Sequence, residues 1–168
     1  VNLAARRFGD LAPVTRPQVD PARFTPRAID RTRPAEQVHL CLGWEGPATA
    51  APGLFAARIF CEAVGGGMAS RLFQELREER GLAYTVYATH APFLDTGLFS
   101  VYAATAPADT NAARDLALKV LNEAADDLDE RELSRARALA KAGLLMALES
   151  CEGQASYVAR QLLVHGRL

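Results

Sequence analysis

Two polar residues of different chemistry, Arg77 and Tyr84, lie seven positions apart where a helical pattern gives way to a strand pattern. A guanidinium offers a planar fork of N–H donors, and a phenol offers one O–H donor. Both groups can hold a peptide carbonyl or a carboxylate, and both can stabilise an oxyanion. The competing interpretation is structural: Arg77 as a solvated helix charge and Tyr84 as a packing aromatic of the strand. Spacing alone favours this structural interpretation.

Other chemistry-bearing motifs are weak. The glycines Gly65–Gly67 follow a helical pattern rather than a strand and lack a following Lys-Ser/Thr pair, so they do not form a phosphate loop. We expect them to end a helix and to permit close backbone packing. Ser70 is not in a Gly-x-Ser-x-Gly elbow, and Cys61, on an apolar helix face, is expected to be a buried and unreactive thiol.

The histidines do not form a metal-ligand pattern. None of His39, His90 and His165 has a His or Cys three or four positions away at helical spacing. His39 and Cys41 would share one face of a strand, but such a pair more often packs than binds a metal. We therefore expect no metal site on this chain.

Composition excludes several classes of protein. The chain has 168 residues, of which 49% are hydrophobic and 23% charged, as in an ordinary globular domain. The net charge of −1, with arginines interleaved with acidic residues, gives no basic face for nucleic acid. No run of apolar residues is long enough to span a membrane. Three cysteines without a close pair suit a reducing compartment, so we expect a cytoplasmic protein.

The order of elements predicts an α+β fold. Residues 1–35 hold five of the nine prolines and are expected to be a linker or arm, with a short edge strand as one option near residues 24–31. Residues 36–168 are expected to form the domain. The patterns predict a strand at 36–44, helices at 54–67 and 68–79, an antiparallel hairpin over 82–106 around Asp95-Thr96-Gly97, and helices at 109–128, 129–150 and 155–168.

This order indicates two layers, a mainly antiparallel sheet covered by helices on one face. Helical spacing predicts which side chains of the covering helices face the sheet. These are Met68, Leu72, Phe73 and Leu76 in the second helix, Ala112, Leu116, Val120 and Ala124 in the third, and Leu133, Ala136, Leu144 and Leu148 in the fourth.

A longer motif resembles a known family. The segment "GGGMASRLFQELREERGLAYTVYA", followed by "DTGLFSVYAA", resembles the signature of the second domain of pitrilysin (insulinase) family zinc metallopeptidases. Within that family it looks like the bacterial peptidases that are similar to mitochondrial processing peptidase, and the resemblance covers about residues 24–168. In that family two homologous domains face each other across a chamber. The first carries an inverted zinc motif, His-x-x-Glu-His, and the second contributes an Arg and a Tyr. The resemblance implies that Arg77 and Tyr84 bind substrate and that Tyr84 is also catalytic.

The departure from the family pattern is equally informative. The chain contains no His-x-x-Glu-His sequence. We therefore expect no cofactor on this chain and zinc on a homologous partner domain, either in the same chain or in a partner subunit. Family members usually continue with another helix and a closing strand, so we expect a truncated second domain.

The resemblance implies the substrate-binding domain of a zinc metalloendopeptidase that hydrolyses peptides or unfolded protein segments, inactive alone. An exposed sheet edge could add to substrate binding, and the strand that holds His39 is a candidate. The alternative is a non-catalytic interaction or assembly subunit of the same family. A third alternative, an independent protein that binds a small ligand, is supported by no motif in the sequence. Retention of both Arg77 and Tyr84 favours the peptidase.

Overall fold

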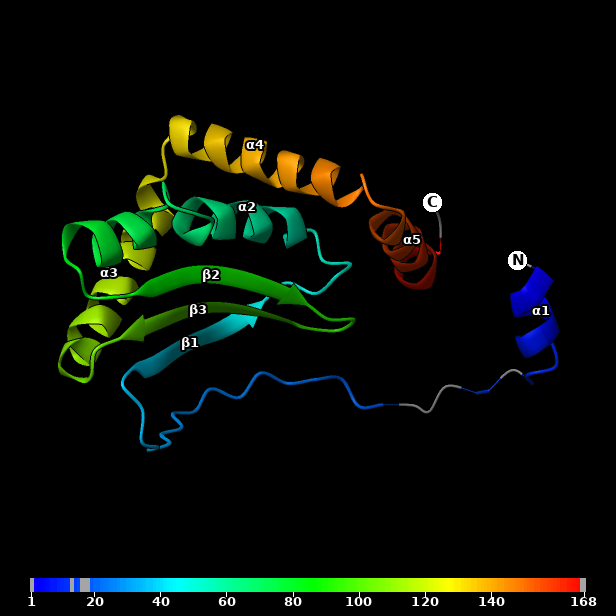
Figure 1. The fold of residues 1–168 in the computed structure, drawn as a ribbon, viewed down its shortest axis with the longest axis horizontal. Coiled ribbons are helices and arrows are strands. Elements are labelled where there is room, and N and C mark those ends of the chain that lie inside the picture. Colours follow the sequence, from blue (N-terminus) through cyan, green and yellow to red (C-terminus); the bar gives the residue numbers. More distant parts are fainter. Residues whose placement is uncertain (1, 13, 16–18, 167–168) are drawn as a thin grey trace.

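The computed structural model describes residues 2–12, 14–15 and 19–166 of the chain. Helices and strands follow one another in the order expected for an α+β domain (Figure 1). The elements are α1 (Asn2–Phe8), β1 (Val38–Gly46), α2 (Leu54–Gly65), the π-helix η1 (Phe73–Glu79), β2 (Thr85–Pro92), β3 (Gly97–Thr105), the short 3₁₀ helix η2 (Pro107–Asp109), α3 (Thr110–Asp127), α4 (Glu130–Ala147), α5 (Cys151–Arg160) and the π-helix η3 (Gln161–His165).

The strands form a three-stranded antiparallel sheet in the order β1-β3-β2. The hairpin between β2 and β3 closes through Phe93, whose N–H donates to the carbonyl oxygen of Thr96 at 2.8 Å. Register pairs Leu42 with Val101, and Tyr87 with Tyr102. The predicted fold class and antiparallel hairpin are confirmed.

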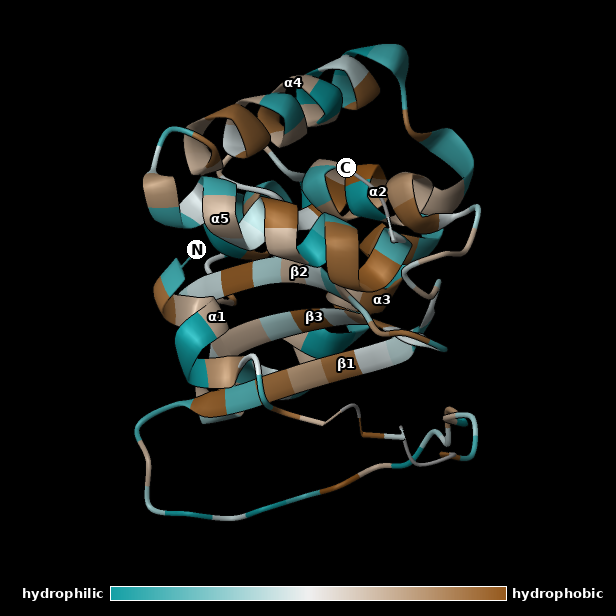
Figure 2. Ribbon diagram, turned by 90° about the vertical axis from the view of Figure 1, so that its right-hand side faces the viewer, coloured by the Kyte–Doolittle hydropathy of each residue, from teal (hydrophilic) through white to brown (hydrophobic). Residues whose placement is uncertain are grey.

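One face of the sheet is covered by α2, η1 and α3, which share one apolar core with β2 and β3. Val64, Leu72, Leu76 and Val101 are among its fully buried side chains. Helix α4 packs on α2 on the side away from the sheet, where Ala136 is buried (Figure 1). Figure 2 shows β1 at the lower edge of the sheet, with the N-terminal arm extending beyond it.

The end of α2 approaches the sheet so closely that only glycine fits there. A Cβ on Gly65 would lie 2.3 Å from the backbone nitrogen of Ala88 in β2, closer than any real contact. Gly67 then takes a φ of +107°, which disfavours side chains. Helix termination and close packing, as expected from the sequence, are confirmed as the role of these glycines.

Two predictions for local structure are wrong. The optional edge strand near residues 24–31 is not formed, because this exposed stretch has no regular secondary structure and its prolines weaken strand pairing. The helix expected from Met68 begins only at Arg71, after a turn in which the Ser70 hydroxyl donates to Gly67 O at 2.6 Å. Met68 lies in that turn and is 74% exposed instead of facing the core.

The burial predicted for the later helices also needs correction. In α3 the inward face holds Ala113 and not Ala112, together with Leu116, Val120 and Ala124 as predicted. In α4 only Ala136 is buried, and Leu144 is 49% exposed. Apolar side chains therefore recur at helical spacing along α4 even in turns against which no described element packs.

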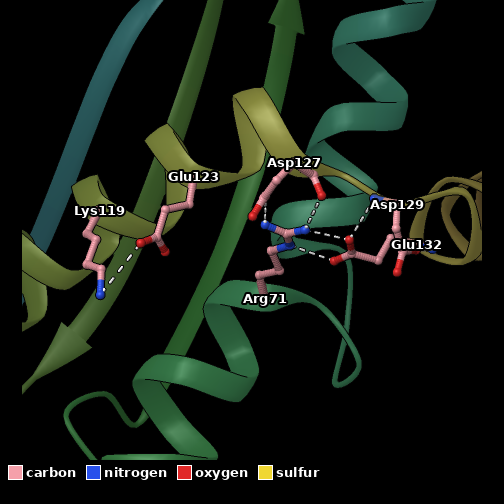
Figure 3. Close-up of polar contacts among 6 residues, drawn as sticks. All are labelled: Arg71, Lys119, Glu123, Asp127, Asp129 and Glu132. Atoms are coloured by element: carbon pink, nitrogen blue, oxygen red, sulfur yellow. Dashed lines mark hydrogen bonds and ion pairs between the residues drawn. The ribbon is translucent and has the colours of Figure 1, made fainter.

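The short helical segment that leads into η1 is tied to the end of α3 and the start of α4 by three residues, Arg71, Asp127 and Glu132, which we call the Arg71 clasp (Figure 3). Arg71 donates through Nε and Nη2 to the two carboxylate oxygens of Glu132, each at 2.6 Å, and through Nη1 to the carboxylate of Asp127. Glu132 also completes a capping box with Asp129 at the start of α4. The side chains of Arg71 and Glu132 are only 22% and 16% exposed, so this pair of the clasp is shielded from solvent, whereas the side chain of Asp127 is 63% exposed.

Removal of the clasp arginine should destabilise the fold. Arg71→Ala leaves a half-buried carboxylate without its partner, so we expect the free energy of unfolding to fall by about 1–3 kcal/mol. The matched control is Lys119→Ala, because Lys119 pairs with Glu123 at 3.6 Å while both side chains are more than half exposed. That change should cost less than about 0.5 kcal/mol. Denaturant unfolding measures both, and equal losses would contradict a structural role for the clasp.

The clasp should also make stability depend on acid pH. The hydrogen bond from Arg71 lowers the pKa of Glu132 below its usual value of 4.5. Because the folded state favours the ionised carboxylate, this stabilisation is complete above about pH 4.5 and is lost as the pH falls below it. The stability advantage of the parent protein over Glu132→Gln should therefore shrink between neutral and acid pH. A difference that stays constant across that range in denaturant titrations would contradict the ionic contribution.

Candidate functional site

Arg77 and Tyr84 flank the reversal of the chain between η1 and β2. The reversal needs Gly81, whose φ of +62° lies in the left-handed region that favours glycine. The N–H of Gly81 donates to the carbonyl oxygen of Arg77 at 3.2 Å, and that of Leu82 donates to Leu76 O at 2.7 Å. These bonds end the π-helix, a wide-turned element that occurs often at functional sites.

The second half of this corner is held by β3. The hydroxyl of Thr105, a residue that is fully buried, donates to the carbonyl oxygen of Leu82 at 2.6 Å. The backbone N–H of Tyr84 donates to Ala104 O at 2.8 Å. The backbone on both sides of the reversal is therefore pinned to secondary structure, and its side chains project from a fixed base.

Tyr84 does not pack in the core. The chain bends at this residue, so the alternation of the strand is interrupted: Ala83 and Val86 are each 5% exposed, whereas Tyr84 is 57% exposed. Among the described residues, no side chain forms a hydrogen bond with its hydroxyl. The phenol is thus available to a ligand, and within the described chain the structural interpretation of Tyr84 as a packing aromatic does not hold.

Arg77 is also accessible. It follows Leu76, which is fully buried, and its own side chain is 46% exposed. Its guanidinium carbon lies 4.7 Å from the ring centre of Phe73, and its Nε lies 3.9 Å from a carboxylate oxygen of Glu78. Within the described chain the guanidinium donates no hydrogen bond, and neither a hydrogen bond nor a cation–π contact joins it to Tyr84. Both proposed site residues therefore offer free donors at one corner.

The described residues offer no set of side chains suited to a zinc ion. The described residues include no cluster of three or more His, Cys, Asp or Glu side chains that could hold a metal. The Nδ1 of His39 lies 2.6 Å from the hydroxyl of Tyr102, and the Nε2 of His90 lies 3.0 Å from the carbonyl oxygen of Pro47. Each of these histidines is thus engaged by a neighbour that is not a metal ligand.

The cysteine expected to be unreactive is buried. Cys61 is 7% exposed, and burial raises the pKa of its thiol to about 12. Its thiolate is therefore scarce at neutral pH, and nucleophilic catalysis by Cys61 is disfavoured.

Sequence reasoning did not anticipate three features of this region. Phe73 lies under Arg77, a contact that their i, i+4 spacing could have suggested. The Arg71 clasp joins residues far apart in the sequence, and no local pattern indicates it. An apolar groove of about 680 Å³ lies between β1, α2 and α4, with Trp44 and Phe55 in its lining. Neither Arg77 nor Tyr84 lines that groove. Because both side chains are about half exposed, the candidate site is an open corner.

Comparison with known proteins identifies the class. The family model described as the peptidase M16 inactive domain matches residues 1–139, and the chain belongs to this family. An uncharacterized zinc protease of Mycobacterium tuberculosis (strain H37Rv) is 36% identical over 174 residues, which cover 99% of this chain and 40% of that protein. The uncharacterized zinc protease YmxG of Bacillus subtilis is 30% identical over 148 residues, which cover 86% of this chain and 36% of that protein.

A solved structure agrees with this assignment. A peptidase M16 inactive domain from Pseudomonas fluorescens has 30% sequence identity and a TM-score of 0.61 over 66% of this chain and 27% of that chain. The chain therefore spans well under half the length of these relatives. The predicted recognition is confirmed: the chain is an inactive domain of zinc-protease-family proteins. None of the helices described is long and apolar enough to cross a membrane.

The isolated chain should hold no stoichiometric zinc, because its described residues contain no ligand cluster. Metal analysis of the purified chain, after dialysis against metal-free buffer, measures this. One tightly held zinc per molecule would contradict the expectation and would return His39 and Cys41 to consideration as ligands.

Proposed function

We propose that the chain is the substrate-binding domain of a zinc metalloendopeptidase that hydrolyses peptide bonds in peptides or unfolded protein segments. One observation carries the proposal. Arg77 and Tyr84, the residues that the family resemblance singles out, are both exposed and project from one pinned corner of an M16 inactive domain.

The proposal divides the work between two domains. A zinc ion on the catalytic partner domain would activate water for attack on the peptide bond. Arg77 holds the substrate, because its N–H fork can take a backbone carbonyl or a neighbouring carboxylate. Tyr84 donates its O–H to the carbonyl oxygen of the substrate as negative charge develops there. This chain therefore binds and orients, and it stabilises charge with one neutral donor.

The pinned backbone is what makes such a donor effective. A donor stabilises developing charge best when it is already oriented, since no reorganisation is needed during the reaction. The bond from the Thr105 hydroxyl to Leu82 O and the bond from Tyr84 N–H to Ala104 O hold the backbone that carries the phenol. This supports a role in orientation as well as in affinity.

In the complete protein, Tyr84→Phe should lower kcat by roughly a hundred- to thousandfold, the usual effect of losing one preorganised donor to an oxyanion. Arg77→Ala should act largely on KM, because a gripping residue contributes to ground-state binding. Zinc content should be unchanged in both variants, since neither side chain is a metal ligand. Steady-state hydrolysis of a fluorogenic peptide, with metal analysis, measures all three quantities.

Two matched controls test whether position matters. Tyr87→Phe removes a phenolic hydroxyl from β2, the strand that follows Tyr84, where Tyr87 stacks on Tyr102 and is 42% exposed. Arg80→Ala removes an exposed arginine that instead pairs with Glu75 at 3.3 Å. Both controls should cleave at close to the parental rate. If folded, zinc-loaded Tyr84→Phe and Arg77→Ala proteins do so as well, the proposal fails. A complete parent protein without any hydrolysis would favour the alternative of an interaction or assembly role.

A further inference from the structure

We infer that Phe73 is a positioning residue for Arg77: its ring orients the guanidinium so that the N–H groups face the substrate. This inference rests on the proposed function, because it explains how the proposed substrate-binding arginine is held. It assigns a role to an aromatic residue that the sequence pattern places only in the core.

The geometry is that of a cation–π contact. The guanidinium carbon of Arg77 lies 4.7 Å from the centre of the Phe73 ring, inside the range of about 6 Å over which such contacts act. An arginine stacked on a ring uses its flat face, whereas its hydrogen bonds lie in the plane of the guanidinium. The contact therefore restrains the side chain and leaves its N–H donors free for a carbonyl or carboxylate.

The ring is the fixed partner of this pair. Phe73 is half-buried and packs against the core, and its neighbours along the helix, Leu72 and Leu76, are fully buried. Arg77 is 46% exposed and has several rotatable bonds that solvent would otherwise leave free. An anchored ring beneath a mobile cation lowers the conformational entropy that binding would otherwise cost.

The neighbouring acids do not provide the same restraint. The carboxylate of Glu78 lies 3.9 Å from Arg77 Nε, too far for a hydrogen bond, and the two side chains are 53% and 46% exposed. Salt and water screen such a pair. Glu75 is engaged with Arg80 at 3.3 Å. Phe73 is thus the contact best able to orient the guanidinium.

A double-mutant cycle in the complete protein tests the inference, with peptide hydrolysis as readout. Phe73→Leu keeps an apolar side chain of similar size but removes the ring face. It should raise KM by roughly two- to fivefold, the scale of an exposed cation–π contact, and leave kcat unchanged. In the Arg77→Ala background the same change should have no further effect, because the group that Phe73 positions is absent. Phe73→Tyr keeps a ring face and should stay near the parental KM.

Two controls separate positioning from general packing. Phe99→Leu removes another half-buried ring that packs against the same core but contacts Trp44 and Phe60. It should lower thermal stability without changing KM. Glu78→Gln should change KM less than Phe73→Leu does, and the effect of Phe73→Leu should persist at high salt.

These outcomes distinguish a failure of the positioning role of Phe73 from a failure of the proposed function. If Arg77→Ala raises KM and Phe73→Leu does not, the positioning role is wrong while the proposed function stands. An equal rise in KM from Phe73→Leu in the Arg77→Ala background also overturns it, because Phe73 then acts independently. An Arg77→Ala protein with parental KM removes the proposed substrate-binding role and this inference together.

A structural readout remains decisive even where Phe73→Leu fails to fold. In the parent protein, NMR should show ring-current shifts and nuclear Overhauser contacts between the Phe73 ring and the Arg77 side chain. Their absence overturns the inference.

Discussion

The burial of Leu72 and Leu76 under the sheet is the constraint on which the candidate site depends. Both side chains are fully excluded from water, and they join η1 to the same core as α2, α3 and the strands. Phe73 directly follows Leu72 and Arg77 directly follows Leu76. The burial of the two leucines therefore determines which side chains of η1 face outward. The chain reversal at Gly81 is held by backbone hydrogen bonds, so it also fixes the position of Tyr84 relative to η1.

Two arginines of the same segment show how one residue type can serve two purposes. Arg71, at the start of the helical stretch, uses its N–H groups on Glu132 and Asp127 and is mostly shielded from solvent. Arg77, six residues later, donates no hydrogen bond to any described residue and is half exposed. The first arginine is satisfied within the fold and stabilises it, whereas the second keeps the unused donors that a ligand requires.

This division is consistent with the place of the chain in its family. The described residues of this M16 inactive domain include no cluster of metal-ligating side chains. Its zinc-protease relatives are more than twice as long as the matched region. A domain that lacks metal-ligating side chains can still affect a reaction through hydrogen-bond donors that contact the substrate. The open corner between η1 and β2, rather than an enclosed cavity, is compatible with a site completed by another domain.

Local patterns were sufficient to predict the class of fold, whereas the candidate residues were singled out by the resemblance to a family motif. Alternating aromatic and β-branched residues around Asp95-Thr96-Gly97 predicted the hairpin, because side chains on a strand alternate between its two faces. The glycines after α2 predicted a helix end. The absence of a His-x-x-Glu-His sequence excluded that zinc motif from this chain. The family motif drew attention to Arg77 and Tyr84.

Only the tertiary structure decided how these residues are presented. Periodicity places an apolar side chain on a face, but whether that face meets a core depends on segments distant in sequence. For this reason Met68 is exposed in a turn, and Leu144 lies on an uncovered part of α4. Tyr84 is exposed because a bend at this residue interrupts the strand alternation, while its backbone N–H donates to Ala104 O of β3. The Arg71 clasp joins residues about 60 positions apart in the sequence, and no local sequence pattern specifies it. The i, i+4 spacing of Phe73 and Arg77 allows their contact, but only the structure shows that it forms.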